Sequence, residues 1–225
     1  LYYYTLAATF FNTNFNFGRD YLMGICYIFG AADGLPDELV KNDGDLIIAA
    51  DSGINHLEKF GVQPDIAVGD FDSLGFVPDC AEVIKHPVMK NDTDTILAVK
   101  TGFERGYNEF VIYGGVGGRP DHTFANYQTL CYISRHGGRG YLCFNGYTAC
   151  CITNSEIEFS EREGTVSVFA MSGTAEGVTL EGVLYPLENA VLEYSFPLGV
   201  SNEFTGTTAK MSVKNGTLLI IWRNK

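Results

Sequence analysis

Two aspartates that flank a phenylalanine are the first residues in this chain that suggest chemistry. The stretch GDFDS, residues 69–73, places Asp70 and Asp72 on either side of Phe71, directly after a short apolar run. In an extended segment, residues two apart project to the same side, so we expect both carboxylates to face one point while Phe71 turns toward the core. Such a pair suits Mg²⁺, which takes oxygen ligands and keeps positions for water and substrate phosphates.

Three other short stretches carry polar residues of the same kind. AADSG contains Asp51, KNDTDT contains Lys90 and Asp94, and GGVGGRPDH contains Arg119, Asp121 and His122. Each stretch, taken alone, is equally consistent with a helix cap or a tight turn. Together they place acidic side chains in separate loops, which would repel one another unless a cation lies among them. We therefore expect Asp94, with Asp51 nearby, to join Asp70 and Asp72 around one or two magnesium ions.

The glycine-rich stretch at residues 114–119 predicts a binding site for phosphate groups. Glycines let backbone N–H groups approach phosphate closely, and the N-terminus of a following helix adds a partial positive charge. Arg119 and Lys90 would supply full cations. Neither the G-K-S/T ending of a P-loop nor a G-x-G-x-x-G dinucleotide fingerprint is present. The pattern indicates a site for a metal and a nucleotide, and leaves the reaction open.

These residues need an open α/β sheet to position them, and residues 23–146 have the pattern of one. Short runs rich in Ile, Val, Phe and Tyr alternate with helical patterns, which is typical of a largely parallel sheet covered on both faces. We predict strands at 25–31, 46–51, 66–70, 83–86, 110–114 and 141–145, and helices at 54–60, 95–105 and 121–136. The polar stretches cluster beyond the carboxyl ends of these strands, where such sheets bind ligands.

Residues 147–225 have a different pattern, which predicts an all-β sandwich or barrel domain after the α/β domain. We predict strands at 147–153, 156–161, 165–171, 174–180, 191–196, 209–213 and 217–222. The pair Asn215-Gly216 predicts a hairpin, because a type I′ turn needs positive φ at both central positions. Residues 1–22 lack the basic start of a signal peptide and an amphipathic pattern. We expect them to be an extension outside the fold, the alternative being an arm that packs on a partner subunit.

Composition excludes several classes of function. With 27 acidic and 15 basic residues and a formal net charge of −12, the chain lacks the positive surface that nucleic acids or anionic membranes require. It has no run of about 18 apolar residues, so we expect no membrane-spanning helix. The six cysteines form no C-x-x-C pair and have no metal-site spacing with the four histidines. This pattern indicates reduced thiols, a cytoplasmic location and no zinc site.

On five motifs taken in order, the chain resembles the bacterial thiamine pyrophosphokinases, also called thiamine diphosphokinases. The motifs are AADSG, GDFDS, K-x-D-T-D-T followed by L-A, GG-x-GGR-x-DH-x-x-A-N and, in the β domain, SNE followed by a late tryptophan. The resemblance extends from about residue 25 to residue 222. It implies a homodimeric enzyme that transfers the pyrophosphoryl group of Mg-ATP to the hydroxyethyl oxygen of thiamine and releases AMP.

The resemblance also implies roles for individual residues. Asp70, Asp72 and Asp94 match the metal-binding acids, and Lys90, Arg119 and Asp121 complete the expected catalytic set. Expected nucleotide contacts are Asp51, Ser52, Gly53, Gly115, Gly117, Gly118, Arg119 and Asn126. Ser201, Asn202 and Trp222 match positions that hold thiamine, with the thiazolium ring stacked on Trp222. Thiamine would lie between the α/β domain of one subunit and the β domain of its partner, which would also mediate dimerisation.

In the reaction that the resemblance implies, the thiamine alcohol attacks the β-phosphorus of ATP in line, and AMP leaves without a covalent intermediate. Asp94 or Asp121 would orient the alcohol. Two other functions remain open. One is a Mg-dependent nucleotide hydrolase in which the same acids activate water, and the other is a non-catalytic nucleotide sensor whose β domain binds a partner. Consumption of ATP without thiamine would favour the hydrolase, and binding of thiamine would argue against the sensor.

Overall fold

The computed structural model describes residues 24–72, 75, 78, 80–85, 92–171 and 173–224. These residues form two compact units that divide between Asn145 and Gly146. Residues 24–145 are named the α/β unit here, and residues 146–224 the β unit. The predicted extension at 1–22 and the predicted phosphate-binding Lys90 lie outside the described residues.

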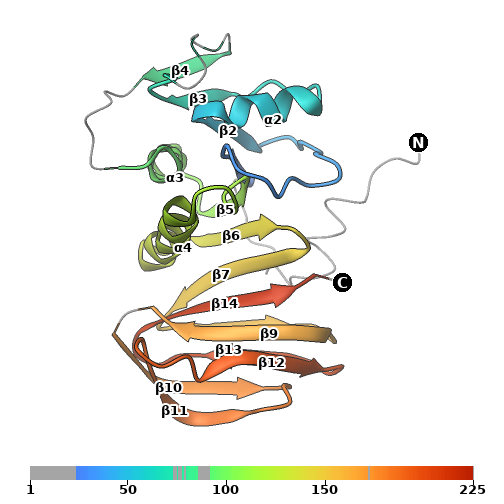
Figure 1. The fold of residues 1–225 in the computed structure, drawn as a ribbon, viewed down its shortest axis with the longest axis vertical. Helices are drawn as coiled ribbons and strands as arrows, with labels where there is room; N and C mark the ends of the chain where they lie inside the picture. Colours follow the sequence, from blue (N-terminus) through green and yellow to red (C-terminus); the bar gives the residue numbers. More distant parts are fainter. Residues whose placement is uncertain are drawn as a thin grey trace. The chain divides into compact units, whose positions relative to one another are not determined.

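The α/β unit is built on a parallel sheet whose strand order is β6-β5-β1-β2-β3-β4 (Figure 1). Its strands are β1 (Cys26–Phe29), β2 (Leu46–Ala50), β3 (Ile66–Gly69), β4 (Glu82–Lys85), β5 (Glu109–Tyr113) and β6 (Arg139–Phe144). In the central strand β1, Ile28 pairs with Ile48 on one side and with Ile112 on the other. Every residue of β1, β2, β3 and β5 is buried, because both faces of the sheet are covered.

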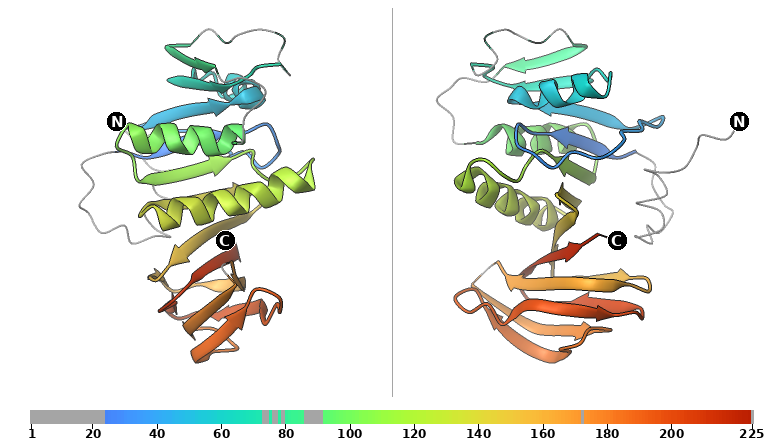
Figure 2. Two further views of the ribbon diagram at one scale, coloured as in Figure 1. Left: turned by 90° about the vertical axis from the view of Figure 1, so that its left-hand side faces the viewer. Right: turned by 45° about the vertical axis from the view of Figure 1, so that its right-hand side comes forward.

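Helices cover the two faces of this sheet unequally. They are the single turn η1 (Asp51–Gly53) and the helices α2 (Ile54–Lys59), α3 (Asp94–Glu104) and α4 (Pro120–Arg135). Right-handed crossovers place α3 and α4 on one face and α2 on the other, since the chain moves along the sheet in opposite directions through them (Figures 1 and 2). Phe103 of α3 meets Tyr132 of α4 edge-on, with ring centroids 6.4 Å apart. No helix in the described ranges has the length and apolar character needed to cross a bilayer.

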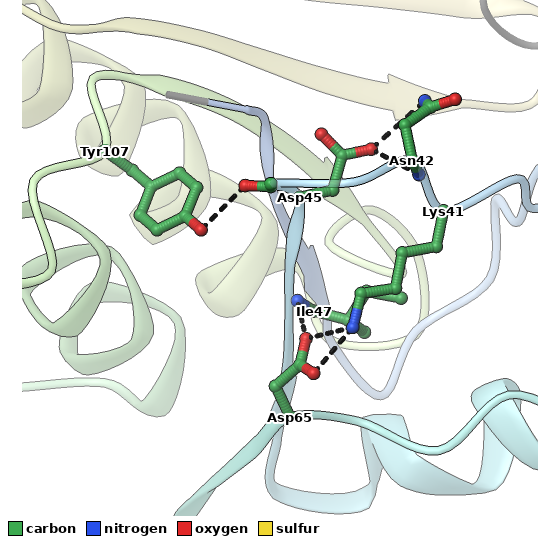
Figure 3. A network of polar contacts seen from close by, with 7 residues as sticks. Lys41, Asn42, Asp45, Ile47, Asp65 and Tyr107 are labelled. Carbon is green, nitrogen blue, oxygen red and sulfur yellow. Dashed lines mark hydrogen bonds and ion pairs between the residues drawn. The ribbon is translucent and has the colours of Figure 1, made fainter. Parts of the chain in front are cut away.

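Acidic residues at the amino ends of the strands have a structural role (Figure 3). Asp65, just before β3, accepts a hydrogen bond from the Ile47 N–H at 2.8 Å and pairs with Lys41 Nζ at 2.6 and 2.7 Å. Asp45, just before β2, accepts the Ile25 N–H at 2.8 Å. Both carboxylates satisfy backbone donors that the parallel ladder leaves without partners at this edge. These two aspartates therefore belong to the fold and lie at the edge opposite the predicted site.

The β unit consists of two antiparallel sheets, with strand orders β12-β9-β14-β7 and β11-β10-β13-β8. The strands are β7 (Tyr147–Thr153), β8 (Glu156–Phe159), β9 (Glu163–Ala170), β10 (Thr174–Glu181), β11 (Leu187–Glu193), β12 (Gly199–Thr205), β13 (Ala209–Ser212) and β14 (Thr217–Arg223). Phe159 from one sheet meets Trp222 and Phe204 from the other, with ring centroids 5.1 Å apart in both pairs. The core lies between the sheets, and the predicted fold class is confirmed.

The structure of the β unit differs from the local predictions at two points. Strand β12 was not predicted, because Gly199, Ser201 and Asn202 have low strand propensity. The Asn215-Gly216 hairpin does not form, because β13 and β14 belong to different sheets and the chain crosses between them. Gly216 has a φ of 119°, whereas Asn215 is absent from the positive-φ region that a type I′ turn requires.

Candidate active site

The loops that follow β1, β2, β3 and β5 touch one another at the carboxyl edge of the α/β sheet. A Cβ atom on Gly53 would lie only 1.8 Å from the carbonyl oxygen of Phe29, so the turn after β2 lies directly on the end of β1. A Cβ on Gly69 would lie 3.2 Å from Cα of Asp51, which joins the ends of β2 and β3. At the other side, the Gly30 N–H donates to the Tyr113 carbonyl at 2.8 Å. These contacts bring the predicted acidic and glycine-rich loops to one edge.

The turn between Asp70 and Asp72 differs from the predicted extended segment. Phe71 has a φ of +60°, in the left-handed region, and the Asp72 N–H donates to Asp70 Oδ1 at 3.1 Å. The predicted inward orientation of Phe71 is confirmed, since its side chain is 3% exposed. Asp51 also has a positive φ, of 47°. Of the six residues other than glycine with a positive φ in the described part of the chain, Asp51 and Phe71 lie in adjacent acidic loops. Such backbone conformations are often found at functional sites.

The donor chemistry of this turn fits magnesium. Asp70 is half-buried and Asp72 exposed, and their carboxylates offer oxygen ligands only. Within the described ranges, no three His, Cys, Asp or Glu residues gather closely enough to form a metal cage. The joint role of Asp70, Asp72 and Asp94 as magnesium ligands therefore stays a prediction. Magnesium commonly binds through one or two carboxylates together with substrate phosphates and water, so the Asp70 and Asp72 pair remains a suitable partner.

Asp94 is the first residue of α3 and is half-buried. The helix begins with Thr93 as its N-cap, whose Oγ1 accepts the Ile96 N–H at 3.3 Å. At the far end of the helix, Arg105 pairs with Glu82, at the start of β4, at 2.6 Å. The C-terminal end of α3 therefore lies at the amino end of β4. An 11-residue helix spans roughly 16 Å, so the opposite end of α3, with Asp94, is directed toward the carboxyl edge of the sheet.

The glycine-rich loop is shaped by side chains of α4. Asn126, 6% exposed, donates from Nδ2 to the Gly115 carbonyl at 2.7 Å. Thr123 Oγ1 accepts the Gly117 N–H at 3.2 Å and donates to the Arg119 carbonyl at 3.3 Å. Asn126 and the Gly117 N–H, both expected to contact nucleotide, are therefore engaged in hydrogen bonds that fix the conformation of the loop. Thr123 was missed by sequence reasoning, although a Thr in the first turn of a helix after a glycine-rich loop is a recognisable capping signal.

Arg119 and Asp121 form an exposed bidentate pair at the N-terminus of α4. Arg119 Nη2 donates to Asp121 Oδ2 at 2.5 Å, and Nε donates to Oδ1 at 3.2 Å. The hydrogen bond from Arg119 lowers the pKa of the Asp121 carboxyl below its ordinary value, and Asp121 raises the pKa of Arg119. The pair keeps a guanidinium fork beside the glycine-rich loop, with the planar geometry that also suits phosphate.

Asp33, in the loop after β1, is an acidic residue that sequence reasoning missed at this edge. A Cβ on Gly117 would lie 3.9 Å from both Cβ and Oδ2 of Asp33, so the two loops are adjacent. The side chain is exposed. The signal was available, because the stretch GAADG follows a buried strand just as AADSG and GDFDS do.

In the β unit, Asn202 is 4% exposed and is engaged within the chain. Its Oδ1 accepts the N–H groups of Tyr185, at 3.0 Å, and Glu203, at 2.9 Å, while Nδ2 donates to the Tyr185 carbonyl at 2.8 Å. Ser201 is exposed, has a φ of +56° and donates its N–H to Ser167 Oγ at 3.0 Å. Of the Ser201-Asn202 pair, only Ser201 presents its side chain to solvent.

Trp222 is a core residue of the β unit, which argues against the predicted stacking on thiamine. Its side chain is 1% exposed and meets Phe159 edge-on. The guanidinium carbon of Arg162 lies 6.0 Å from the centroid of the same ring. A ring that stacks on a ligand needs an open face, and this tryptophan is enclosed and already beside a cation.

Comparison with known proteins finds relatives of both units. A family model described as thiamin pyrophosphokinase, catalytic domain, matches residues 38–142, and one described as thiamin pyrophosphokinase, vitamin B1 binding domain, matches residues 154–218. Together they match about three quarters of the chain.

Individual relatives and a solved structure agree with these matches. Thiamine pyrophosphokinase of Bacillus subtilis (strain 168) is 28% identical over 184 residues, covering 78% of this chain and 86% of that protein. Thiamin pyrophosphokinase 1 of Caenorhabditis elegans is 25% identical over 187 residues, covering 77% and 76%. The crystal structure of thiamine pyrophosphokinase from Bacillus subtilis superposes with a TM-score of 0.79 at 25% identity, covering 90% of this chain and 100% of that one.

Proposed function

The chain belongs to the thiamine pyrophosphokinase family, and from this premise we propose that it makes thiamine diphosphate and AMP from thiamine and Mg-ATP. Family membership carries the coarser statement, that the enzyme transfers pyrophosphate to thiamine. The observation that best supports a Mg-nucleotide as donor is the meeting of the acidic turn and the glycine-rich loop region at one edge of the parallel sheet.

In the proposed reaction the hydroxyethyl oxygen of thiamine attacks the β-phosphorus of ATP. The new O–P bond forms as the bond from the β-phosphorus to the bridging oxygen breaks, and AMP leaves with that oxygen. The proton of the alcohol passes to a carboxylate or to water. The protein contributes position and charge, because this kind of transfer requires no covalent intermediate.

Phosphate binding is proposed for the end of the glycine-rich loop and the start of α4. Arg119 is exposed there, and apart from Gly118 itself and its two chain neighbours no described residue has an atom within 4 Å of a Cβ built on Gly118. A triphosphate would compete with Asp121 for the guanidinium fork of Arg119. The carboxylate of Asp121 thus released is proposed to orient the alcohol or accept its proton. Asp94 is the other candidate for this role. Asn126 and Thr123 act indirectly, by holding the loop.

Magnesium is proposed to bind at Asp70 and Asp72, with Asp94 as a further candidate ligand. When bound, the ion would offset the negative charge of the triphosphate and fix its orientation. Asp51, whose Cα would lie 3.2 Å from a Cβ on Gly69 just before this turn, and its neighbour Ser52 are proposed to contact the nucleotide side of the site. Ser52 Oγ lies 3.5 Å from Asp51 Oδ2, so the two side chains face each other.

We also propose that the enzyme is a homodimer with the thiamine site at the subunit interface. The β unit exposes several large apolar side chains, which are Leu184, Val191, Phe196, Leu198 and Val200. Where such side chains form a contiguous patch, they are typical of surfaces that bind another protein or a ligand. The expected mass in solution, measured by light scattering after size-exclusion chromatography, is twice 24.7 kDa. A monomer at working enzyme concentration would contradict this part of the proposal.

The decisive experiment is mass-spectrometric detection of products after incubation with thiamine, ATP and Mg²⁺. We expect thiamine diphosphate and AMP in equal amounts, and neither product when thiamine or Mg²⁺ is omitted. Release of phosphate or pyrophosphate from ATP without thiamine would favour a nucleotide hydrolase instead. Binding of nucleotide with no turnover under any of these conditions would favour a sensor.

A further inference from the structure

We propose that Asn202 is a positioning residue that fixes Tyr185, and that the exposed ring of Tyr185 is the aromatic surface that thiamine contacts in the β unit. This inference rests on the proposed function and refines its thiamine site. The motif SNE was expected to touch thiamine directly, and Trp222 was expected to stack on it. The structure instead engages Asn202 within the chain and buries Trp222, while a nearby tyrosine remains open.

The first supporting observation is a two-point attachment between one side chain and one backbone residue. Asn202 Oδ1 accepts the Tyr185 N–H at 3.0 Å, and Nδ2 donates to the Tyr185 carbonyl at 2.8 Å. The side-chain amide thus satisfies both backbone groups of Tyr185, as a neighbouring strand would. Oδ1 also accepts the Glu203 N–H, so within the described part of the chain both the oxygen and the nitrogen of this buried amide are engaged. Asn202 is therefore poorly placed to bind a ligand itself.

The second observation is the backbone irregularity that directs Asn202 inward. The pairing of β12 with β9 shifts register between Gly199 and Asn202, which marks a β-bulge. Within it, Ser201 adopts a φ of +56°, an unusual conformation for serine, and Val200 and Ser201 are both exposed in succession. Bulges redirect side chains next to binding sites, and left-handed residues other than glycine concentrate at such sites. In a regular strand, side chains alternate between the two faces of the sheet. The bulge breaks this alternation and turns the side chain of Asn202 into the interior.

The third observation is that the whole segment before Tyr185 is held against β12. Leu184 donates its N–H to the Glu203 carbonyl at 2.8 Å, and Val183 forms an isolated bridge with Phe204. Val183 is 6% exposed, whereas Tyr185, two residues on, is 65% exposed. An aromatic ring on a backbone that is already ordered loses little conformational freedom when a ligand binds. Tyr185 is thus a pre-positioned aromatic surface whose backbone is held by Asn202.

The fourth observation concerns charge. Thiamine carries a positive thiazolium ring and an aromatic aminopyrimidine, both of which pack favourably on the face of a tyrosine. Residues 146–225 contain nine glutamates against five lysines and arginines, so a cationic ligand is attracted to this unit. Trp222, in contrast, is enclosed and lies beside the Arg162 guanidinium. Tyr185 is the better contact for a cation on both counts.

The first test compares Tyr185→Ala with the control Tyr194→Ala in steady-state kinetics. Tyr194 is also an exposed tyrosine of the β unit, at 58%, and its backbone N–H donates to the Gly173 carbonyl, at 2.7 Å, instead of to an asparagine side chain. We expect Tyr185→Ala to raise KM for thiamine about five- to tenfold, the size of a lost ring contact, and to leave KM for ATP unchanged. Tyr194→Ala should change neither. Equal effects of the two variants, or an unchanged KM for thiamine in Tyr185→Ala, would overturn the inference.

The second test separates positioning from direct contact. Asn202→Ala and the near-isosteric Asn202→Asp should both raise KM for thiamine, with hydrogen exchange of the Tyr185 amide accelerated. In the double variant Asn202→Ala, Tyr185→Ala the loss should be no larger than in Tyr185→Ala alone, because Asn202 acts through the ring. Additive losses would show that Asn202 contacts thiamine itself. If Asn202→Ala does not fold, Asn202→Asp carries the same comparison.

Failure of this inference and failure of the proposed function can be distinguished. If the wild-type enzyme makes no AMP in a thiamine-dependent manner, the proposed function is wrong and the variants have no meaning. If the wild-type enzyme is active and Tyr185→Ala keeps the wild-type KM for thiamine, only the assignment of Tyr185 is wrong.

Discussion

Phe71 links the core of the α/β unit to its acidic turn. Its buried ring anchors the turn from inside, while its left-handed backbone turns Asp70 and Asp72 through a tight bend. The hydrogen bond from the Asp72 N–H to Asp70 Oδ1 restrains the same bend. A binding turn attached in this way keeps its carboxylates at a defined separation, which reduces the ordering needed when a cation and triphosphate bind.

Replacement of Asp72 by asparagine tests the role of this turn. The exposed side chain contributes little to the fold, so we expect Asp72→Asn to melt within about 2 °C of the wild type and to lose at least about a hundredfold in kcat/KM. Asp43→Asn is the matched control, because Asp43 is an exposed acid in the loop before β2, at the opposite edge of the sheet. AMP formation measures activity, and near-wild-type turnover in Asp72→Asn would remove this aspartate from the metal site.

Arg162 differs from the acids of this turn, because it is a charged residue that is buried in the β unit and has no role in the proposed reaction. The side chain is 3% exposed, and burial lowers the pKa of its guanidinium. Its favourable contacts are the rings of Phe204 and Trp222, at 5.9 and 6.0 Å, and within the described part of the chain it forms no ion pair.

Replacement of Arg162 by methionine should therefore be tolerated. Methionine keeps the length of the apolar stem and removes the desolvated charge, so we expect the free energy of unfolding to stay the same or rise by about 1–2 kcal/mol. Urea denaturation monitored by tryptophan fluorescence measures it. A loss of more than about 2 kcal/mol would mean that the guanidinium has a partner, such as a second subunit.

At the scale of elements, the site depends on how closely the loops at the carboxyl edge approach the strand ends. The turn η1 is pressed against β1 at Gly53, where only a residue without a Cβ fits over the Phe29 carbonyl. The helix α2 continues directly from this turn. The position of Asp51 is thus coupled to the packing of α2 on the sheet.

Substitution of Gly53 by alanine should expose this coupling. With a Cβ 1.8 Å from a backbone oxygen, the turn must move, and we expect a loss of about 2–3 kcal/mol in unfolding free energy together with a higher KM for ATP. Gly137→Ala is the control, because Gly137 has a φ of 79° but open surroundings, so it should lose only about 1–2 kcal/mol from backbone strain. If the two variants lose equal free energy of unfolding, the close approach of Gly53 to the Phe29 carbonyl does not contribute to stability.

At the scale of the whole molecule, buried ionisable groups set the response to alkaline pH. Burial raises the pKa of the Cys150 thiol to about 12 from an ordinary value of 9.0, and it raises the pKa of Cys26 and of the Tyr27 phenol further. These groups stay protonated in the folded chain while they ionise in the unfolded chain. Their contribution to stability is therefore complete below about pH 9 and is lost as the pH rises through the folded pKa.

We accordingly expect the free energy of unfolding to fall steadily between pH 9 and pH 11. Urea titrations at several pH values measure this, and Cys150→Ala should reduce the slope because one titrating thiol is removed. In the same range, Cys150 should resist alkylation by iodoacetamide in the native protein and react in urea. A flat pH dependence, or rapid native labelling of Cys150, would contradict this account.

Much of the architecture follows from local sequence patterns. Leu46–Ala50 and Glu109–Tyr113 could be predicted as strands because continuous apolar runs are typical of a sheet covered on both faces, and helices between them require parallel order. Since the carboxyl ends of parallel strands meet at one edge, the position of the acidic and glycine-rich loops also followed from sequence. Strand β12 could not be predicted, because its bulge and its low-propensity residues are stabilised by pairing with β9.

The sequence by itself determined the fold class, the edge of the sheet where the acidic loops gather and the family to which the chain belongs. Residues of the same type have different roles in this protein, and only the tertiary structure shows which role each one has. Asp65 accepts the backbone N–H of Ile47, Asp70 lies in a turn with a left-handed residue, and Asn202 holds a tyrosine 17 residues away. Trp222 became core. The physical reason is that a side chain's role depends on its partners in space, and these partners come from distant parts of the chain that only folding brings together.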